Sequence, residues 1–293
     1  MKIRIVVSRH SSFYSPLIAA VTAGFLRDEG LGPEYGLLPG NRTARDMIRS
    51  REVDVVQAAV SSNWGAMEQG EQDLPLHFAQ INQRDGFFLA ARDPDPAFHW
   101  KKLEGRSLLA DHGGQPLTML KYAAHSQGVR WERINVVDAG SIQEIDAAFR
   151  SGSGDYVHQQ GPAPQQLERE GIGHPVAAVG EAMPAVAFSS LMASREFLQS
   201  EVAARFTRAY RRARAWVREA PAGEIARSEA AMFPGIDPEA LSRSIARYQL
   251  LGCWDSDVVI TRELYEQSLS VFLHTAAIST RHSYEDVVVP PPG

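Results

Sequence analysis

The amino-acid sequence predicts an α/β fold built from two lobes. Short apolar runs of strand length alternate with longer segments in which apolar residues recur at helical spacing, and this alternation is typical of parallel βαβ units. The chain has 293 residues, of which 44% are hydrophobic. It can therefore bury a large core, and it exceeds the roughly 100–150 residues of a typical domain. We expect two lobes for this reason.

Six segments are predicted to be strands because they are short, apolar and rich in β-branched residues. They are residues 2–7 (KIRIVV), 53–60, 75–81, 87–92, 107–111 and 134–138. The glycine-rich stretch at 151–157 is predicted to lead into another strand. Helical spacing is found between these segments, at 15–30, 43–50 and 115–128.

The chain becomes strongly helical after residue 188. We predict helices over 194–220, 221–233, 237–251 and 261–278, and Asp237-Pro238 has the form of an N-cap followed by proline at the first helical position. The first of these helices carries six arginines, which are Arg205, Arg208, Arg211, Arg212, Arg214 and Arg218. They could form a surface for an anionic partner, but we favour a solvated helix face paired with nearby acidic residues.

Composition excludes several classes of function. The net charge is −5 and the pI is about 6.0, so we expect no nucleic-acid partner, which would need a basic footprint. A single cysteine, Cys253, rules out an intramolecular disulfide, and its apolar flanks predict a buried structural residue. No phosphate-binding loop, dinucleotide fingerprint or metal-ligand spacing is present, so we expect no cofactor and no metal.

The sequence predicts neither a secretory leader nor a membrane-spanning segment. The opening apolar run passes into the polar stretch SRHSS too soon for a secretory leader, and no segment approaches the roughly 18 consecutive apolar residues of a membrane span. We therefore expect a chain that does not span the membrane. Its predicted location is cytoplasmic as written, or periplasmic if a leader has been removed.

Polar loops follow several of the predicted strands. Parallel α/β sheets bind ligands beyond the carboxyl ends of their strands, so these loops supply the candidate site. The candidate ligand-binding residues are Arg9, His10, Ser11, Ser12, Phe13, Asn41, Ser61, Ser62, Asn63, Gly113, Gly114, Gln115, His158 and Gln159.

Simpler interpretations stay open for some of these residues. Gly113 and Gly114 can form an ordinary turn before a helix, which we favour over an anion site, and residues 61–63 are as suited to capping a helix as to binding a ligand. His10, His112 and His158 could share one site, but we favour three independent histidines on the surface or at caps.

Six segments, taken in order, resemble the nitrate/sulfonate/taurine-type solute-binding proteins of ABC transporters, which are related to the thiamine-pyrimidine-precursor proteins. The similar segments are 13–31 (FYSPLIAAVTAGFLRDEGL), 44–60, 100–110 (WKKLEGRSLLA), 147–157 (AAFRSGSGDYV), 194–221 and 284–288 (YEDVV). They span nearly the whole chain. The sequence departs from this pattern at 158–162 (HQQGP), where many members carry an acidic-aromatic segment.

The resemblance implies a type II periplasmic-binding-protein fold, in which two α/β lobes are joined by two crossover strands and enclose a ligand cleft. Lobe 1 would comprise 1–88 plus 189–293 and lobe 2 would comprise 89–188, with 87–92 and 185–190 as the crossovers. The implied function is to bind a small organic solute (a sulfonate, an aromatic acid or a pyrimidine-like molecule) and to deliver it to an ABC permease. Arg9 or Arg42 could pair with an anionic group of the solute.

The same resemblance offers an enzyme as the alternative. The related aryl-sulfinate desulfinases use a cysteine in the cleft of the first lobe, where this chain has Ser11 and Ser12. An enzyme on this scaffold would use His10 or His158 as a base beside a serine hydroxyl. We favour the binding protein because no nucleophilic cysteine is available there.

Overall fold

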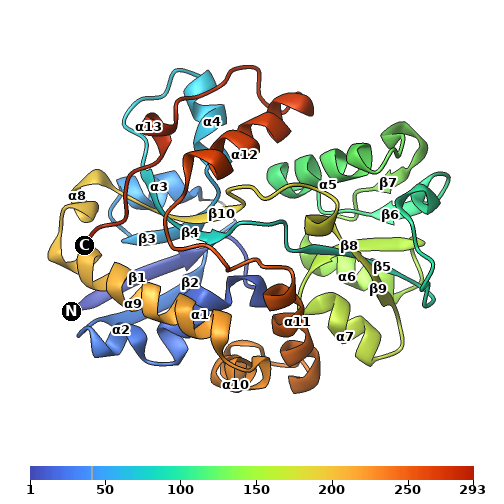
Figure 1. Ribbon diagram of the computed structural model, residues 1–293, viewed down its shortest axis with the longest axis horizontal. Coiled ribbons are helices and arrows are strands. Elements are labelled where there is room, and N and C mark those ends of the chain that lie inside the picture. Colours follow the sequence, from blue (N-terminus) through green and yellow to red (C-terminus); the bar gives the residue numbers. More distant parts are fainter. Residues whose placement is uncertain (41) are drawn as a thin grey trace.

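The computed structural model describes residues 1–40 and 42–293 and has two five-stranded sheets with helices around each. Figure 1 shows the sheets side by side, with both chain termini beside the first. The first sheet has the order β2 (Gly32–Leu37), β1 (Lys2–Val7), β3 (Val55–Ala58), β10 (Ser189–Ala193), β4 (Leu76–Asn82). The second has the order β7 (Asn135–Val137), β6 (Ser107–Leu109), β8 (Tyr156–Gln160), β5 (Phe87–Ala91), β9 (His174–Ala178). The predicted α/β class is confirmed.

Both sheets are mixed. Strand β1 pairs in parallel with β2 and β3, whereas β10 runs antiparallel between β3 and β4. In the second sheet β6 pairs in parallel with β7 and β8, and β5 runs antiparallel between β8 and β9. In each sheet the antiparallel strand is therefore the first one after the chain crosses from the other sheet. The division of the chain into lobes at residues 88 and 189 stays a prediction, and β5 begins at Phe87.

The sequence pattern missed three strands: β2 and β9, which lie at sheet edges, and β10, of which only the start fell in the predicted crossover at 185–190. The run at 2–7 forms β1 over its full length, and the other five predicted segments each contain a strand, most of them shorter. Strands β2 and β9 were not predicted because both contain proline and β2 contains two glycines. Such residues are tolerated at an edge, where one side of the strand needs no hydrogen-bonded partner.

Among the described helices of the first half, one begins with a side-chain cap: the Thr43 hydroxyl accepts from the amide of Asp46 at the start of α3 (Ala44–Arg49). The predicted helix at 15–30 is divided into α1 (Ser15–Thr22) and α2 (Phe25–Asp28) at Gly24, whose φ of 89° is left-handed. The others are α4 (Ser61–Glu68) and α5 (Gly114–Ser126). The N-cap of α4 is Val60, so residues 61–63 lie inside the first turn and do not cap it.

The second half adds two helices beside the second sheet, α6 (Ile142–Arg150) and α7 (Ala163–Arg169), and then a helical region. Its members are α8 (Arg195–Leu198), α9 (Glu201–Glu219), α10 (Ala222–Glu229), α11 (Pro238–Leu250), α12 (Arg262–His274) and α13 (Tyr284–Val287). The predicted helix 194–220 is broken because the Ser200 side chain caps α9. The predicted cap of α11 is confirmed, since Asp237 accepts from the amides of Glu239 and Ala240.

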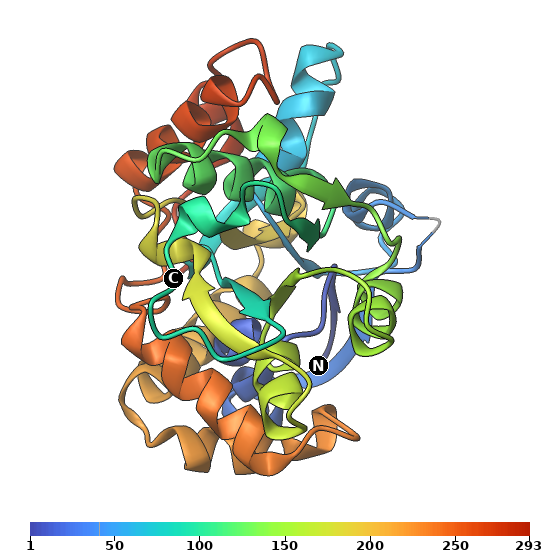
Figure 2. The same cartoon turned by 90° about the vertical axis from the view of Figure 1, so that its right-hand side faces the viewer.

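Short 3-10 turns link these elements, at η1 (Ser12–Tyr14), η2 (Trp100–Leu103), η3 (Trp131–Arg133), η4 (Val179–Glu181) and η5 (Ala230–Met232). Two C-terminal helices also reach the second sheet. Helix α11 packs against α7, and α12 packs against α5, as the side view in Figure 2 shows at the lower and upper ends of the molecule. The segments after residue 193 therefore contact both sheets.

Two adjacent segments connect the sheets, one leaving β4 and one returning to β10. The amide of Val186 donates to the Gln83 carbonyl at 2.9 Å, and the amide of Phe188 donates to that of Asn82 at 3.0 Å. The predicted crossover at 185–190 contains the segment that returns to β10. The predicted crossover at 87–92 instead forms β5 of the second sheet, because the chain crosses just before it, at 83–86.

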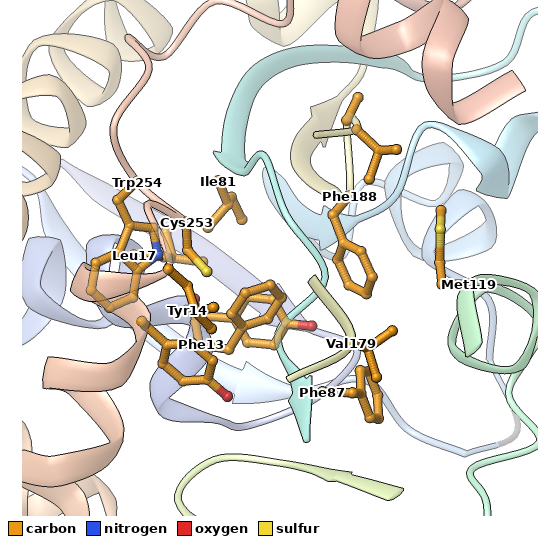
Figure 3. Packing of buried hydrophobic residues seen from close by; sticks show 14 of the residues in the cluster. Phe13, Tyr14, Leu17, Ile81, Phe87, Met119, Val179, Phe188, Cys253 and Trp254 are labelled. Carbon is orange, nitrogen blue, oxygen red and sulfur yellow. Dashed lines mark hydrogen bonds between the residues drawn. The ribbon is translucent and has the colours of Figure 1, made fainter. Parts of the chain in front are cut away.

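An aromatic core lies against this connection (Figure 3). The rings of Phe13 and Phe188 lie 5.4 Å apart, and Phe87 and Tyr248 belong to the same buried cluster. A Cβ on Gly86 would lie 2.3 Å from the Phe13 ring, so the connection needs glycine at that position. The hydrophobic core is therefore continuous through the junction of the two sheets.

The arginines of α9 are mostly paired with carboxylates, as predicted. Arg208 lies 3.1 Å from Glu29 and Arg211 lies 3.0 Å from Asp257. Arg214 differs, because it is only 3% exposed and donates to the Ser256 carbonyl at 2.9 Å and to the carbonyl of Ile81. The prediction of a solvated face was wrong for Arg214, which points toward the end of β4.

Cys253 is fully buried, as predicted. Among the described residues, none of the helices combines the length and the apolar character that crossing a membrane requires.

Candidate ligand-binding cleft

A cavity of about 490 Å³ lies between elements of the two sheets and is lined from both sides. The loop after β1 contributes Arg9, His10 and Ser11, and the segment between η5 and α11 contributes Met232, Phe233, Pro234 and Ile236. The opposite side is formed by Phe87, Asp111, residues 158–163, Gln166 and the inner face of α6. Five predicted site residues therefore meet here: Arg9, His10, Ser11, His158 and Gln159.

The loop after β1 is held in place by its own polar side chains. The Ser11 hydroxyl accepts from the Phe13 amide at 3.1 Å, which caps η1, and donates to the Gly161 carbonyl at 2.5 Å. Because Gly161 follows β8 of the second sheet, this bond joins the two sides of the cavity. Ser11 thus has a structural partner on each side.

His10 is positioned by two hydrogen bonds. Its Nε2 lies 2.7 Å from the Met232 carbonyl and its Nδ1 lies 3.0 Å from the Tyr35 hydroxyl, while the ring stacks on Phe233 with centroids 4.5 Å apart. A carbonyl only accepts, so Nε2 carries the proton and Nδ1 accepts from Tyr35. Burial lowers the pKa of His10, and the imidazole is neutral at pH 7.

Arg9 forms an ion pair across the cavity with Asp111. Arg9 Nη2 lies 3.0 Å from Asp111 Oδ1, and Nη1 donates to Oδ2. Asp111 Oδ1 also accepts from the amide of Gly113 at 2.8 Å. The pair connects the loop after β1 with the loop after β6, so it joins the two sides of the cavity.

His158 is the most unusual group of the site. It is 1% exposed, its ring stacks on Phe87 with centroids 4.3 Å apart, and neither ring nitrogen has a hydrogen-bond partner among the described residues. Burial lowers the pKa of His158 to about 3, so the ring is neutral and offers one donor and one acceptor. Buried polar groups are normally hydrogen-bonded, and a bound ligand would supply the missing partners.

Gln159 lines the cavity from the other face of β8, since neighbouring residues of a strand point in opposite directions. Its Nε2 donates to Asp146 Oδ1 at 3.1 Å, whereas no described residue hydrogen-bonds its Oε1. Asp146 and Arg150 of α6 form an ion pair beside it. This wall can therefore accept one hydrogen bond through Oε1.

Several predicted site residues lie away from this cavity. Ser12 is buried, with its hydroxyl 2.7 Å from that of Ser244, and Phe13 belongs to the core. Both follow Ser11 into η1, which turns their side chains inward. The structure therefore places the end of the candidate loop at Ser11.

The residues from α4 also lie elsewhere. Ser61 donates to Gln115 Oε1 at 2.6 Å, and Asn63 donates to the Pro75 carbonyl at 2.8 Å. Ser62 is on the same helix and does not line the cavity. The neighbouring Trp64 donates to the Tyr265 hydroxyl at 3.0 Å inside the core.

The turn before α5 lies behind the ion pair. Gly113 is the N-cap of α5, which begins at Gly114, and a Cβ on Gly113 would lie 2.6 Å from Arg9 Nη2. Gln115 donates to the Phe188 carbonyl and lines a separate cavity of about 90 Å³. The glycine turn therefore allows Arg9 to approach, and neither glycine lines the larger cavity.

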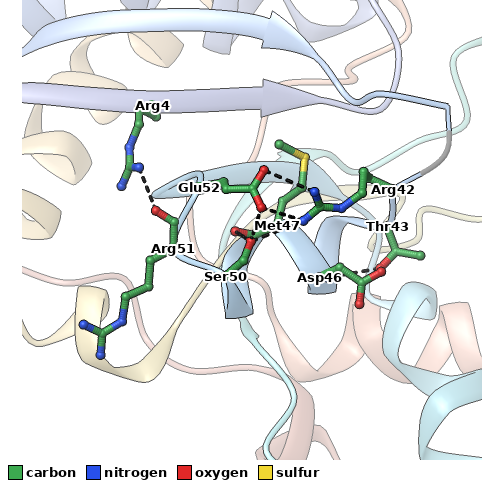
Figure 4. Close-up of polar contacts among 8 residues, drawn as sticks. All are labelled: Arg4, Arg42, Thr43, Asp46, Met47, Ser50, Arg51 and Glu52. Atoms are coloured by element: carbon green, nitrogen blue, oxygen red, sulfur yellow. Dashed lines mark hydrogen bonds and ion pairs between the residues drawn. The ribbon is translucent and has the colours of Figure 1, made fainter.

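The remaining predictions concern Asn41, Arg42 and His112. Asn41 lies outside the described residues. Arg42 Nη2 pairs with Glu52 at 2.7 Å, close to the turn after α3 (Figure 4), and does not line the cavity. His112 contacts the Ala110 carbonyl at 2.8 Å and is also absent from the lining. His10 and His158 thus share a site, and the interpretation of three independent histidines holds only for His112.

The sequence interpretation missed several lining residues. Asp111 was the last residue of the predicted strand 107–111, and the rule that identified Arg9 could have found it, because it is the first polar residue after the apolar run 108–110. Phe87 was assigned to a strand with no role in the site. Met232 and Phe233 follow a helix rather than a strand, so no strand-end rule could find them.

Comparison with known proteins adds to this geometry. YtlA of Bacillus subtilis (strain 168), named as a candidate binding protein, is 28% identical over 291 residues, covering 98% of this chain and 87% of YtlA. Structural similarity extends to the ligand-binding component of an ABC-type import system from Staphylococcus aureus, with a TM-score of 0.76 at 14% identity over 99% of this chain and 97% of that one.

Two further structures are similar at this level. The alkanesulfonate-binding protein SsuA from Xanthomonas axonopodis pv. citri, bound to MOPS, has a TM-score of 0.75 at 15% identity, covering 99% of this chain and 98% of that one. The desulfurization enzyme DSZB has a TM-score of 0.68 at 14% identity, covering 98% of this chain and 96% of that one. At such identities these structures support the periplasmic-binding-protein fold alone.

The family follows from a sequence model. The model of the family described as NMT1/THI5 like matches residues 12–224, which is well over half of the chain. The matched region begins in the loop after β1 and includes the whole second sheet. The chain therefore belongs to the NMT1/THI5-like family.

Proposed function

We propose that this protein binds a small organic solute in the cavity between the two sheets and serves as the substrate-binding component of an ABC-type importer. The observation that carries the proposal is His158, a buried imidazole with two unpartnered nitrogens in the wall of a 490 Å³ cavity. Such a cavity suits a small ligand that is held by a few polar groups among apolar walls.

We propose Arg9, His10, Ser11, His158 and Gln159 as the polar frame of the ligand site. Arg9 and Ser11 join the two sides of the cavity through Asp111 and Gly161, and His10 is fixed to Met232 on its own side. His158 and Gln159 have free nitrogen and oxygen atoms for the solute. The apolar contacts would come from Phe87 and Phe233.

Ligand entry requires the two sides to separate. We propose that two bodies move relative to each other about the connecting segments at 83–86 and 184–188. One body comprises residues 1–88 and 189–293, and the other comprises residues 89–188. Hinge closure of this kind is a common way to enclose a ligand between lobes. Relatives named as binding proteins and as part of an import system support this function and a permease as the partner.

The enzyme alternative finds less support in this chain. Cys253 is fully buried and burial raises the pKa of its thiol, whereas a nucleophilic cysteine needs a lowered pKa and access. A serine nucleophile needs a base within hydrogen-bond reach, but the Ser11 hydroxyl donates to Gly161 and the His10 proton is directed at Met232.

Mass spectrometry of the purified chain tests the proposal. Denaturation should release a co-purified solute, and a thermal-shift screen of small polar and aromatic molecules should identify compounds that raise the melting temperature. Recovery of such a compound unchanged after hours supports binding. Its conversion would support the enzyme alternative instead.

Variants then test the assignment of the cleft. His10→Ala and His158→Ala should each reduce the ligand-dependent shift, whereas the exposed His99→Ala should leave it unchanged. If both cavity variants keep the full shift, the solute binds elsewhere and the proposed site is wrong.

A further inference from the structure

The groups best suited to hold an anionic ligand in this cavity are already occupied by a carboxylate of the chain. Arginine in a two-pronged geometry and a backbone amide at a helix start are common partners of carboxylates and sulfonates. Here Asp111 accepts hydrogen bonds from Nη1 and Nη2 of Arg9 and from the amide of Gly113, just before α5. Asp111 is 6% exposed, so it sits in the position where the anionic group of a solute would otherwise bind.

The other charges around the cavity are balanced as well. Arg150 lies 2.5 Å from Asp146 and also pairs with Glu170, so two carboxylates share one guanidinium. The amide of Ser141, before α6, bonds to the Glu144 carboxylate in a capping box. His10 and His158 are neutral, since burial lowers the pKa of each ring. Among the described lining residues, no positive charge is without a carboxylate partner.

We propose that Asp111 determines the ligand charge of this cleft and restricts it to solutes without net negative charge, that is, to neutral or cationic molecules. This inference rests on the proposed function, because it concerns the same cavity. An anionic solute would have to share Arg9 with Asp111 or displace it. Sharing places two negative charges together, and displacement leaves a buried carboxylate unpaired; both are costly.

The proposed restriction on ligand charge distinguishes this cavity from that of a structural relative. SsuA from Xanthomonas axonopodis is named for alkanesulfonates, which are anions, whereas this cavity has its own anion in place. Removal of the Asp111 charge should therefore free Arg9 and the Gly113 amide and convert the cleft to an anion site.

The test uses three probes of nearly the same shape: benzoate, benzamide and benzamidine, which are anionic, neutral and cationic. Calorimetric titration of the full chain should show that the wild type binds benzoate most weakly. In Asp111→Ala and Asp111→Asn, benzoate affinity should rise about 10–100-fold, as expected for newly available charge-assisted hydrogen bonds. Benzamidine affinity should fall in the same variants.

Two controls isolate the mechanism. Asp138→Asn removes one negative charge from the loop after β7, where the carboxylate is 59% exposed and does not line the cavity, so benzoate binding should not change. Arg9→Gln added to Asp111→Ala should abolish the gain. Asp111→Asn keeps the shape of the side chain and an oxygen for the Gly113 amide, so it carries the test if Asp111→Ala does not fold.

The inference is overturned if wild-type protein binds benzoate as tightly as benzamide, or if the Asp111 variants gain no more than Asp138→Asn. Its failure is distinct from that of the proposed function. The proposed function fails if no solute of any charge binds the wild type in the wider screen. A gain of benzoate binding in Asp111→Ala tests the role of Asp111 even when the wild type binds none of the three probes.

Discussion

The hydroxyl of Tyr248 accepts a hydrogen bond from the Gly161 amide at 2.7 Å and thereby ties α11 to the wall of the cleft. The same hydroxyl donates to the Gly86 carbonyl at 2.9 Å. One side chain thus joins a C-terminal helix, the connection between the sheets and the loop after β8. A Cβ on Gly161 would lie 2.0 Å from the Ser244 hydroxyl, so α11 also requires glycine at this wall.

Tyr248→Phe should lower the free energy of unfolding by about 1–3 kcal/mol, because it leaves the buried Gly161 amide without its partner. Urea unfolding measures this change. Tyr122→Phe is the matched control, since the Tyr122 hydroxyl makes no hydrogen bond to a described residue. Equal stability of the two variants would contradict the role of Tyr248 as a link.

His158→Phe should separate ligand binding from stability. Phenylalanine keeps the stacking on Phe87 and removes two buried nitrogens that lack partners, so the ligand-free protein should unfold with the same or a higher free energy. Solute affinity should fall about tenfold or more, as expected for the loss of one or two hydrogen bonds. Urea unfolding and calorimetric titration with a solute from the thermal-shift screen provide the two measurements, and a drop in stability without a drop in affinity would refute a ligand-binding role.

Asp85 in the connection between the sheets should make stability depend on pH. It is fully buried, one of its oxygens has no partner in the part of the chain that the structure describes, and burial raises its pKa from 3.8 to about 8. The unfolded chain loses this proton near pH 4, whereas the folded chain keeps it to about pH 8, so this group lowers stability progressively as the pH rises between these values.

Asp85→Asn should remove this dependence. The amide oxygen can still accept from the Phe87 amide, as Asp85 does at 2.7 Å. We expect the variant to match the wild type near pH 4 and to exceed its unfolding free energy by about 1 kcal/mol or more at pH 8. Urea unfolding at several pH values checks this, with the exposed Asp93→Asn as control. Parallel curves for the wild type and Asp85→Asn would show that Asp85 is ionised in the folded protein.

Two arginines of α9 should differ sharply in their contribution to stability. Arg214→Met removes the guanidinium that donates to the buried Ile81 carbonyl and to the partly buried Ser256 carbonyl and should cost about 2–4 kcal/mol. Arg211→Met breaks only an exposed pair with Asp257 and should cost about 0–1 kcal/mol. Thermal and urea unfolding of both variants test the difference, and similar values would mean that water replaces Arg214 at these carbonyls.

Local sequence determined the elements of this protein and part of its site. Period and residue type were enough to locate β1 and the cap of α11, because both depend on interactions within a few residues. They also placed Arg9, His10, Ser11 and His158 in loops or strands that end at the cleft. The edge strands β2 and β9 were not predicted, because their glycine and proline residues weaken the sequence pattern of a strand.

Only the tertiary structure decided which of these residues meet and what they do. Arg9 and Asp111 are 102 residues apart in the chain, and their pairing depends on how the loops after β1 and β6 converge. Packing of the two sheets also buries Ser12 and Phe13 in the core and leaves the His158 nitrogens without a partner among the described residues. A local pattern reports burial and backbone preference, whereas the charge balance of a cleft depends on side chains brought together from both sheets.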